Sequence, residues 1–255
     1  MIWLRRALAL AIVVLLWQAV VWLHVVPERY LPSPADVAVA AVAMFASAED
    51  MRAEMLTVGR ALAGFALTVP LGIALGALGA LVPAFQKALR PWTELLRPLP
   101  PAAVIPISVF AIGFGIKLYL FIIAFAGVWA VYFNTVAAFS GTSDVLTRTG
   151  RAFGCDRLAL TFGVVLPSAM PQIFVGIRIA ATVALIGSVV TDIFGGEDGL
   201  GYLLFERAFA LRIPDVFALT LLCGVNGMLF NQMVLVLRRL VIGWHDRMNA
   251  EALAA

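Results

Sequence analysis

Long runs of uncharged, apolar residues are the feature that most constrains what this chain can fold into. Crossing the hydrocarbon core of a bilayer takes about 20 apolar helical residues, and several runs in the sequence reach that length. Hydrophobic residues make up 63% of the chain and charged residues 13%, whereas soluble domains carry about 45–50% apolar and about 25% charged residues. These values exclude a soluble globular protein and predict an all-α, polytopic bundle of membrane helices.

Six apolar runs predict about six transmembrane helices, at 7–23, 61–82, 98–116, 118–139, 168–190 and 216–237. The first run follows two arginines, as in a signal peptide, but it is longer than the usual core of about 7–15 residues and lacks a small-residue cleavage site. We therefore expect it to remain as an anchor. The third run begins with three prolines in four residues, 98–101. We expect an irregular start there because proline lacks an amide hydrogen.

The segment between the first two runs is polar, and the second run carries a packing motif. Residues 27–59 hold several acidic residues, and the apolar stretch 37–46 within them is too short to cross a membrane. We therefore predict a short surface helix there. In the second run, Gly72 and Gly76 form a GxxxG pair, which lets two helix backbones approach closely.

The distribution of Lys and Arg predicts the orientation, because cytoplasmic loops are enriched in them. With the N-terminus inside, eleven fall on the cytoplasmic side and five outside, so we predict that both termini are cytoplasmic. The net charge of +3 is too small to indicate a nucleic-acid partner. The inner eleven are Arg5, Arg6, Lys87, Arg90, Arg97, Arg148, Arg151, Arg157, Arg238, Arg239 and Arg247, and the outer five are Arg29, Arg52, Lys117, Arg207 and Arg212.

Residues 141–167 form the longest central cytoplasmic segment in this arrangement. Ser143 or Asp144 is suited to begin a short helix, and Gly154 is suited to end it. The segment holds three arginines with apolar residues between them. The residues alone allow two interpretations: an ordinary surface loop that is basic because it is cytoplasmic, or a helix that binds a partner.

The segment resembles the EAA loop of ABC transporter permeases, whose pattern is E-A-A, three residues, G, nine residues, I, one residue and L-P. Gly154 is followed by nine residues and then by V-V-L-P at 164–167, so the second half matches. In the first half R-T-G stands at 148–150, and the acidic residue of the pattern is absent. The residues that the resemblance assigns to ATPase coupling are Arg148, Thr149, Gly150, Arg151, Gly154, Val164, Leu166 and Pro167.

Further motifs are similar to those of the permeases of nitrate, sulfonate and taurine importers. They are Leu31-Pro32-Ser33-Pro34, Arg97-Pro98-Leu99-Pro100-Pro101 with Ile105-Pro106, Phe114-Gly115, Gly199-Leu200-Gly201-Tyr202 and Trp244-His245. The resemblance implies a type I (MetI-like) permease fold, a multi-pass protein of the bacterial inner membrane, and a non-catalytic subunit that works as a dimer. It further implies partner ATPase subunits that bind ATP and Mg, an extracytoplasmic solute-binding protein, and no cofactor in this chain.

The expected organisation follows from the spans and the resemblance together. Residues 1–57 comprise the first span and the outer segment, 58–242 the permease core with the coupling loop 141–167, and 243–255 a cytoplasmic tail. The chain contains no G-x-x-x-x-G-K-[ST] phosphate loop. We therefore expect an external motor, and a solute of the nitrate, sulfonate or taurine type or a thiamine-precursor pyrimidine.

Polar residues inside the spans are candidates for the solute path, because ionisable residues there cost about 2.5–3.5 kcal/mol at a helix centre. The candidates are Asn134, Arg178, Asp192 and Asn231. Other interpretations stay open for each of them. Arg178 is near enough to the cytoplasmic end of its span to extend toward that face, Asp192 fits the outer interface, and the asparagines are equally suited to hydrogen bonds between helices.

Two other classes of function are less consistent with the sequence. A secondary transporter normally has internal repeats and several intramembrane carboxylates for ion coupling, and the spans here contain one acid near an end. A membrane-embedded enzyme needs a convergent nucleophile, base or metal set, but His24 and His245 lie near opposite ends of the chain.

Overall fold

The computed structural model describes the backbone of residues 2–27 and 29–254 and the side chains of residues 5, 8–27 and 29–243. Within these residues all regular secondary structure is helical. The side chains of the Trp244-His245 motif lie outside the described residues. In chain order the helices are α1 (Ile2–Trp22), α2 (Pro34–Ala46), α3 (Ala48–Leu81), α4 (Pro83–Leu96), α5 (Pro101–Ile112), α6 (Ile116–Ser140), α7 (Asp144–Ala152), α8 (Arg157–Leu160), the π-helical turn η1 (Thr161–Val165), α9 (Leu166–Gly195), α10 (Leu200–Phe209) and α11 (Ile213–Ala254).

The helix lengths confirm a polytopic all-α bundle. Among the described residues, four helices are long and apolar enough to cross a membrane: Ala48–Leu81, Ile116–Ser140, Arg157–Gly195 and Ile213–Gly243. A fifth crossing results if α4 and α5, which are bent by 103° relative to each other, form one broken span. The apolar part of α1, Leu8–Trp22, is shorter than these, so a sixth span at 7–23 stays a prediction.

The third apolar run differs from a single continuous span. It contains α5, whose 12 residues extend only about 18 Å at 1.5 Å per residue. Residues 97–100 are not helical and separate α5 from α4, which confirms the expected irregular start. Gly113 ends α5 and Gly115 precedes α6, with φ values of +81° and +113°. These are left-handed conformations that only glycine adopts readily, and they turn the chain into α6.

The polar outer segment is more helical than the sequence predicted. The predicted surface helix is present as α2, which Ser33 caps by accepting a hydrogen bond from the Asp36 amide at 3.2 Å. Helix α3 then begins at Ala48, thirteen residues before the apolar run at 61, and Ser47 caps it through the Asp50 amide at 3.2 Å. The polar first turns of α3 stay helical because they bind α10 and α11, as described below.

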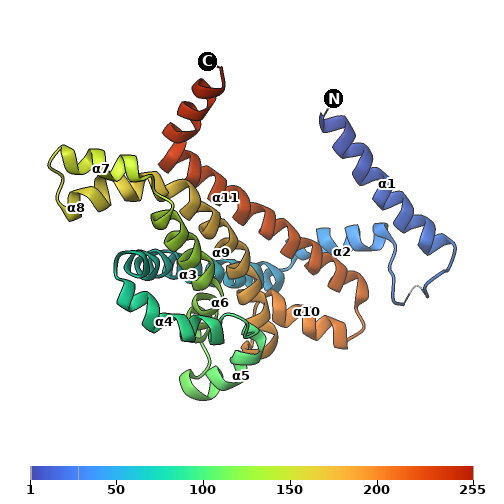
Figure 1. The fold of residues 1–255 in the computed structure, drawn as a ribbon. Coiled ribbons are helices and arrows are strands. Elements are labelled where there is room, and N and C mark those ends of the chain that lie inside the picture. The colour runs from blue at the N-terminus through green and yellow to red at the C-terminus, as the bar shows by residue number, and fades with distance from the viewer. Residues whose placement is uncertain (1, 28, 255) are drawn as a thin grey trace.

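Helices α3, α6 and α9 form the centre of the bundle, and small residues allow their backbones to approach (Figure 1). A Cβ atom on Gly72 would lie 2.5 Å from the Cβ of Val131, and one on Gly76 would lie 2.5 Å from the Cβ of Thr135. The GxxxG pair therefore faces α6, in the close contact that its spacing predicted. One turn before Val131 on α6, Gly127 lies against both α3 and α9.

We expect Gly76→Ala to destabilise the bundle by about 1–3 kcal/mol, because overpacking of a tight contact costs that much. The matched control is Gly59→Ala on the same helix, where an added Cβ meets no atom within 4 Å. There alanine should stabilise the helix by up to about 1 kcal/mol. Unfolding in dodecyl maltoside micelles titrated with dodecyl sulfate measures both. Equal stability of the two variants would contradict the packing described here.

The bundle places several segments at a common end. In Figure 1 the helices α7 and α8 lie at the end of the molecule where α1 begins and α11 ends, and α5 lies at the opposite end. This arrangement agrees with the predicted placement of both termini on the side of residues 141–167. The assignment of this end of the molecule to the cytoplasmic side stays a prediction from the Lys and Arg distribution.

Candidate coupling segment and charged clusters

The segment between α6 and α9 contains the short helix that the sequence predicted. Ser143 caps α7 by accepting a hydrogen bond from the Val145 amide at 3.3 Å. The helix ends at Ala152, the Phe153 amide donates to the Thr149 carbonyl at 3.1 Å, and Gly154 follows with φ of +83°. A residue with positive φ after the last helical turn is the usual glycine stop. Both predicted boundaries, the cap and the stop, are therefore confirmed.

Helix α7 packs closely onto the turn that leads into α9. Gly150 is buried, and a Cβ atom at this position would lie 2.7 Å from Leu160 Cδ1 and 3.5 Å from Val164 Cγ2. Leu160 and Val165 are buried in the main core, and Val164 and Leu166 pack against it. The predicted coupling residues Gly150 and Val164 therefore hold α7 against α8 and η1, and Leu166 packs against the main core.

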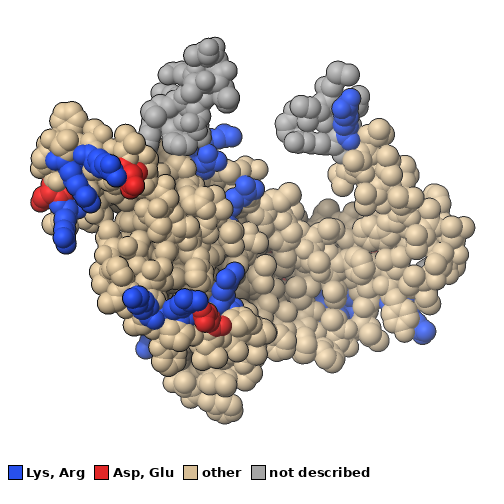
Figure 2. All heavy atoms as spheres, viewed as in Figure 1, with Lys and Arg blue, Asp and Glu red and all other residues tan. Residues whose placement is uncertain are grey.

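Four other predicted coupling residues face outward. Arg148, Thr149, Arg151 and Gly154 are exposed. Phe153 is 84% exposed beside them. Figure 2 shows Lys and Arg side chains gathered over α7 and α8, with a few acidic ones. The segment thus presents a surface that is both basic and apolar.

Helix α8, the turn η1 and α9 form one continuous helix from Arg157 to Gly195, 39 residues long. At 1.5 Å per residue it extends about 58 Å. The turn η1 widens the helix, because the Leu166 amide donates to the carbonyl of Thr161, five residues back. Pro167 follows directly as the second residue of α9. A proline ring clashes with the carbonyl four residues before it in a regular helix, and the wider turn relieves that clash.

The four predicted path residues all make hydrogen bonds between helices. Asn134 on α6 accepts from Gln172 of α9 at 2.9 Å, and Asn231 on α11 accepts from Arg178 Nε of α9 at 2.6 Å. Asp192 bonds to α3, as described next. For the two asparagines these are the hydrogen bonds between helices that the sequence left open as an interpretation, and a role in the solute path stays a prediction for all four residues.

Asp192 lies at the end of α9 opposite α7, in a buried charged cluster. Its side chain is fully buried and forms an ion pair with Arg60 of α3 at 3.1 Å. Its other oxygen accepts from the Thr57 hydroxyl at 2.6 Å and from the Gly201 amide at 3.4 Å. Arg60 also pairs with Asp198 at 2.6 Å. The cluster joins α3, α9 and the glycine-rich turn between α9 and α10.

The guanidinium of Arg60 also lies against the face of an aromatic ring. It lies 4.2 Å from the centre of the Tyr119 ring and donates to the Tyr119 hydroxyl at 3.1 Å. In the sequence Arg60 directly precedes the apolar run 61–82. A charged residue bordering an apolar run is a signal of function or of pairing. Its partner is 132 residues away, so the pattern does not identify the pair.

The glycine-rich turn fits tightly against this cluster. Gly199 has φ of +101°, and a Cβ atom there would overlap the Asp192 carboxylate. A Cβ atom on Gly201 would overlap the Val189 carbonyl oxygen of α9. The two glycines of the predicted G-L-G-Y motif therefore let the turn lie directly on the end of α9.

Two further polar contacts attach the first turns of α3 to α10 and α11. Asp50 and Arg207 form an ion pair in which both side chains are almost fully buried. One turn further along α3, Glu54 accepts a hydrogen bond from Asn226 of α11 at 3.0 Å. Among the described residues, no group of three or more His, Cys, Asp or Glu side chains is placed to hold a metal ion.

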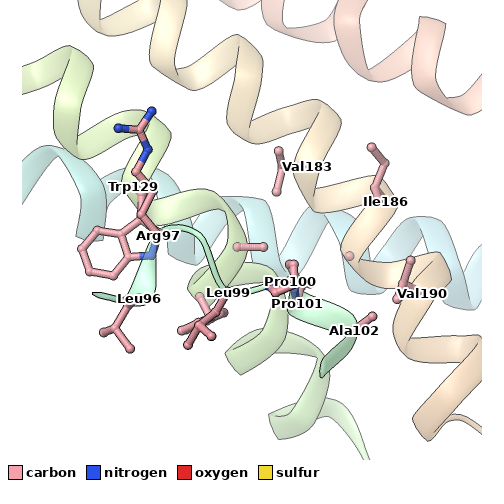
Figure 3. Close-up of a pocket in the computed structure, with 13 residues that line it drawn as sticks. Leu96, Arg97, Leu99, Pro100, Pro101, Ala102, Trp129, Val183, Ile186 and Val190 are labelled. Atoms are coloured by element: carbon pink, nitrogen blue, oxygen red, sulfur yellow. The ribbon is translucent and has the colours of Figure 1, made fainter. Parts of the chain in front are cut away.

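Two cavities adjoin the break between α4 and α5. One, of about 350 Å³, lies among the break, α6 and α9 and has mostly apolar walls. Figure 3 shows Arg97 and Trp129 at one end of it, with Val183, Ile186 and Val190 across from them. The other, of about 560 Å³, lies between α4 and α6 and contains Lys87, Arg90 and Glu94. Arg97 lines both cavities.

The sequence is similar to transport permeases over almost its whole length. It is 28% identical to an aliphatic sulfonates transport permease protein of Bacillus subtilis over 96% of this chain and 88% of the relative. It is 27% identical to the taurine transport system permease protein of Escherichia coli, over 94% of this chain and 89% of the relative. The nitrate import permease protein of Synechocystis is 25% identical over 72% of this chain and 66% of the relative.

A solved structure and a protein family also match this chain, and both are of the same kind as these relatives. A chain of the MetNI methionine ABC transporter in inward-facing conformations matches with a TM-score of 0.61 at 16% identity, over 73% of this chain and 94% of that one. Residues 68–243 match the family described as "Binding-protein-dependent transport system inner membrane component". The bundle of apolar helices and these matches establish a multi-pass protein of the inner membrane. The chain belongs to the family of binding-protein-dependent transport system inner membrane components.

Proposed function

We propose that this chain is the permease subunit of an ATP-driven importer and that α7 and α8 bind a separate ATPase. One observation carries the proposal: an exposed basic and apolar helix is fixed onto the first turns of a continuous helix of 39 residues. A surface loop without a partner has no need of such a rigid attachment. The relatives are named for transport of aliphatic sulfonates, transport of taurine and import of nitrate, which supports the same class.

The geometry explains how force at α7 would reach the far end of the bundle. Gly150 brings α7 into direct contact with Leu160, so a displacement of α7 moves α8 with it. Helix α9 continues from there to Asp192, which binds α3. Tilting of α9 would therefore be transmitted to α3 at the opposite end, which is a rocking motion of the kind that alternates access to a path. The turn η1 is a suitable hinge, since π-helical turns frequently occur at functional sites.

The proposed assembly supplies what this chain lacks. It contains a second copy of the permease, two ATPase subunits that bind ATP and Mg, and an extracytoplasmic binding protein that delivers the solute. The chain itself carries no phosphate loop and acts without catalysis. The solute is of the small type named for the relatives, sulfonate, taurine or nitrate, or a thiamine-precursor pyrimidine. Within the path we keep Asn134, Arg178, Asp192 and Asn231 as the candidates.

The test of coupling is Gly154→Asp. An aspartate at this position must adopt φ near +83°, which costs about 1–2 kcal/mol for a residue with a Cβ. It also places a negative charge beside three arginines that we expect to contact the ATPase. We expect the apparent affinity of the purified permease for its ATPase to fall at least about tenfold, which corresponds to about 1.4 kcal/mol. Pull-down with the tagged ATPase in detergent measures it.

The matched control is Gly163→Asp, which adds the same charge within η1. A Cβ atom there meets no atom within 4 Å, and the residue has no positive φ. We expect ATPase binding close to that of the unmodified chain. Membrane insertion of both variants should be normal. Full ATPase binding and full transport by Gly154→Asp would refute the coupling role, and transport by the permease without any ATPase would refute the proposed function itself.

A further inference from the structure

Helix α4 carries its charged residues on one face and large apolar residues on the opposite face. The charged residues follow one another at spacings of three and four, which places them on one side of a helix; they are Lys87, Arg90, Glu94 and Arg97, the last directly after the final turn. On the opposite face Trp92 and Leu95 are 59% and 60% exposed. A helix with Lys and Arg on one face and Trp and Leu on the other is typical of helices that lie in a membrane interface.

The position of α4 in the fold agrees with such a location. Helix α3 ends beside the second half of α6, where Gly79 lies against Tyr132, and α6 leads on to α7. Helix α4 therefore begins toward the end of the bundle that carries α7, which is the predicted cytoplasmic side. It is bent by 103° relative to α5, and Thr93 is the one buried residue among those described in α4. Most of its surface is thus available to lipid and to headgroups.

The charged face of α4 borders the cavity of about 560 Å³ between α4 and α6. In its wall Glu94 is paired with Arg90 at 2.8 Å, whereas no carboxylate of the described residues pairs with Lys87 or Arg97. The guanidinium of Arg97 lies 5.0 Å from the centre of the Phe133 ring. Figure 2 shows Lys and Arg side chains gathered over α4 beside an acidic one. The cavity therefore carries two uncompensated positive charges.

The surroundings of these charges favour a lipid over a dissolved anion. A small anion would neutralise Lys87 and Arg97 but leave the exposed side chains of Trp92 and Leu95 uncovered. A phospholipid covers both kinds of surface, since its phosphate is an anion and its acyl chains are hydrocarbon. Tryptophan is enriched where membrane proteins meet the interface, and basic pockets between membrane helices on the cytoplasmic side bind anionic headgroups.

We propose that the cavity between α4 and α6 binds the headgroup of an anionic phospholipid from the cytoplasmic leaflet. Its phosphate contacts Lys87 and Arg97, and its acyl chains lie along Trp92 and Leu95. The bound lipid fixes α4 in the interface next to the break before α5. This proposal goes beyond the permease function, because it concerns the lipid around the chain and does not depend on which solute is carried.

The experiment is native mass spectrometry of the full-length chain in detergent, titrated with phosphatidylglycerol or phosphatidylcholine of the same acyl chains. We expect the first lipid bound to be phosphatidylglycerol, at least about tenfold more tightly than phosphatidylcholine, because the two uncompensated cations contribute about fivefold each. Lys87→Gln should weaken the binding of phosphatidylglycerol about fivefold, which corresponds to about 1 kcal/mol for one cation near an anionic lipid. Lys87→Gln combined with Arg97→Gln should weaken it about 25-fold.

Glu94→Gln should act in the opposite direction. It releases Arg90 from its ion pair, so phosphatidylglycerol should bind about fivefold more tightly. The Glu94 side chain is 65% exposed, and misfolding does not produce a gain of binding, so this variant tests the proposal even if the double variant fails to fold. The matched control is Lys117→Gln, which removes an exposed cation at the start of α6, the end of that helix farther from α7. It should bind within about twofold of the unmodified chain.

Four outcomes would overturn the proposal. They are equal binding of the two lipids, unchanged binding of phosphatidylglycerol in Lys87→Gln and Glu94→Gln, an effect of Lys117→Gln as large as that of Lys87→Gln, and displacement of phosphatidylglycerol by an equimolar amount of inorganic phosphate. The last would assign the cavity to a dissolved anion. All four are measured without an ATPase, so failure here and failure of the proposed function are separate observations.

Discussion

Arg60→Met is expected to lower the free energy of unfolding by about 3–5 kcal/mol, the usual cost of removing one partner from a buried ion pair. The substitution keeps most of the side-chain volume and removes the charge. Asp192, which is fully buried, then keeps neutral donors such as the Thr57 hydroxyl and the Gly201 amide but has no cation. A carboxylate without a cation in this position is strongly disfavoured. Unfolding in mixed micelles measures the loss.

A double variant separates the charge from the packing. In Arg60→Met with Asp192→Asn the unpaired charge is gone, so we expect this variant to be more stable than Arg60→Met alone. Such recovery is the coupling energy of a double-mutant cycle. The control is Arg90→Gln, whose pair with Glu94 is exposed, and it should show no measurable change in stability. If Arg60→Met were as stable as the unmodified chain, the cluster would not hold α3 to α9.

Arg207→Met is expected to have a similar effect, about 3–5 kcal/mol, because it leaves Asp50 buried without a cation. The structural change in Arg207→Met is expected to be more local than that in Arg60→Met. Asp50 lies in the first turn of α3, and without the pair we expect that turn and α10 to separate. Hydrogen exchange of the amides in these two elements should rise more than in α6 and α9. Unchanged exchange in both elements would contradict the attachment.

Replacing both members of this pair tests whether the charge is needed. In Asp50→Leu with Arg207→Met no buried charge remains, and well-packed apolar replacements are often neutral or stabilising. We expect most of the lost stability to return. The nearby control is Arg212→Met, because Arg212 is exposed where it pairs with Asp215 at 2.6 Å. This variant should change stability by no more than about 1 kcal/mol.

The sequence predicted the features that depend on short-range patterns. Apolar runs predicted the long helices of the core, since membrane crossing requires length and lack of charge. The boundaries of α7 followed from Ser143 and Gly154, because capping and the left-handed stop are local backbone chemistry. The GxxxG spacing predicted a close helix contact, and Gly76 makes it with Thr135 of α6.

The features that sequence analysis did not predict depend on contacts between distant residues. Arg60 is 132 residues from Asp192, and Asp50 is 157 residues from Arg207. These pairs explain why α3 begins at Ala48, in a stretch whose polarity suggested surface structure. Hydropathy also does not reveal how far a proline-rich stretch bends a span, so the 103° break beside α5 came only from the structure.

The close contact between the glycine-rich turn and α9 offers a way to measure how α9 moves. Because Gly199 and Gly201 leave no room between the turn and the end of α9, the turn has little freedom of its own. Glu197, which is exposed within it, therefore moves as one body with the helix below. A spectroscopic reporter attached there would follow the orientation of the whole 39-residue helix, and so any tilt of its other end at α8.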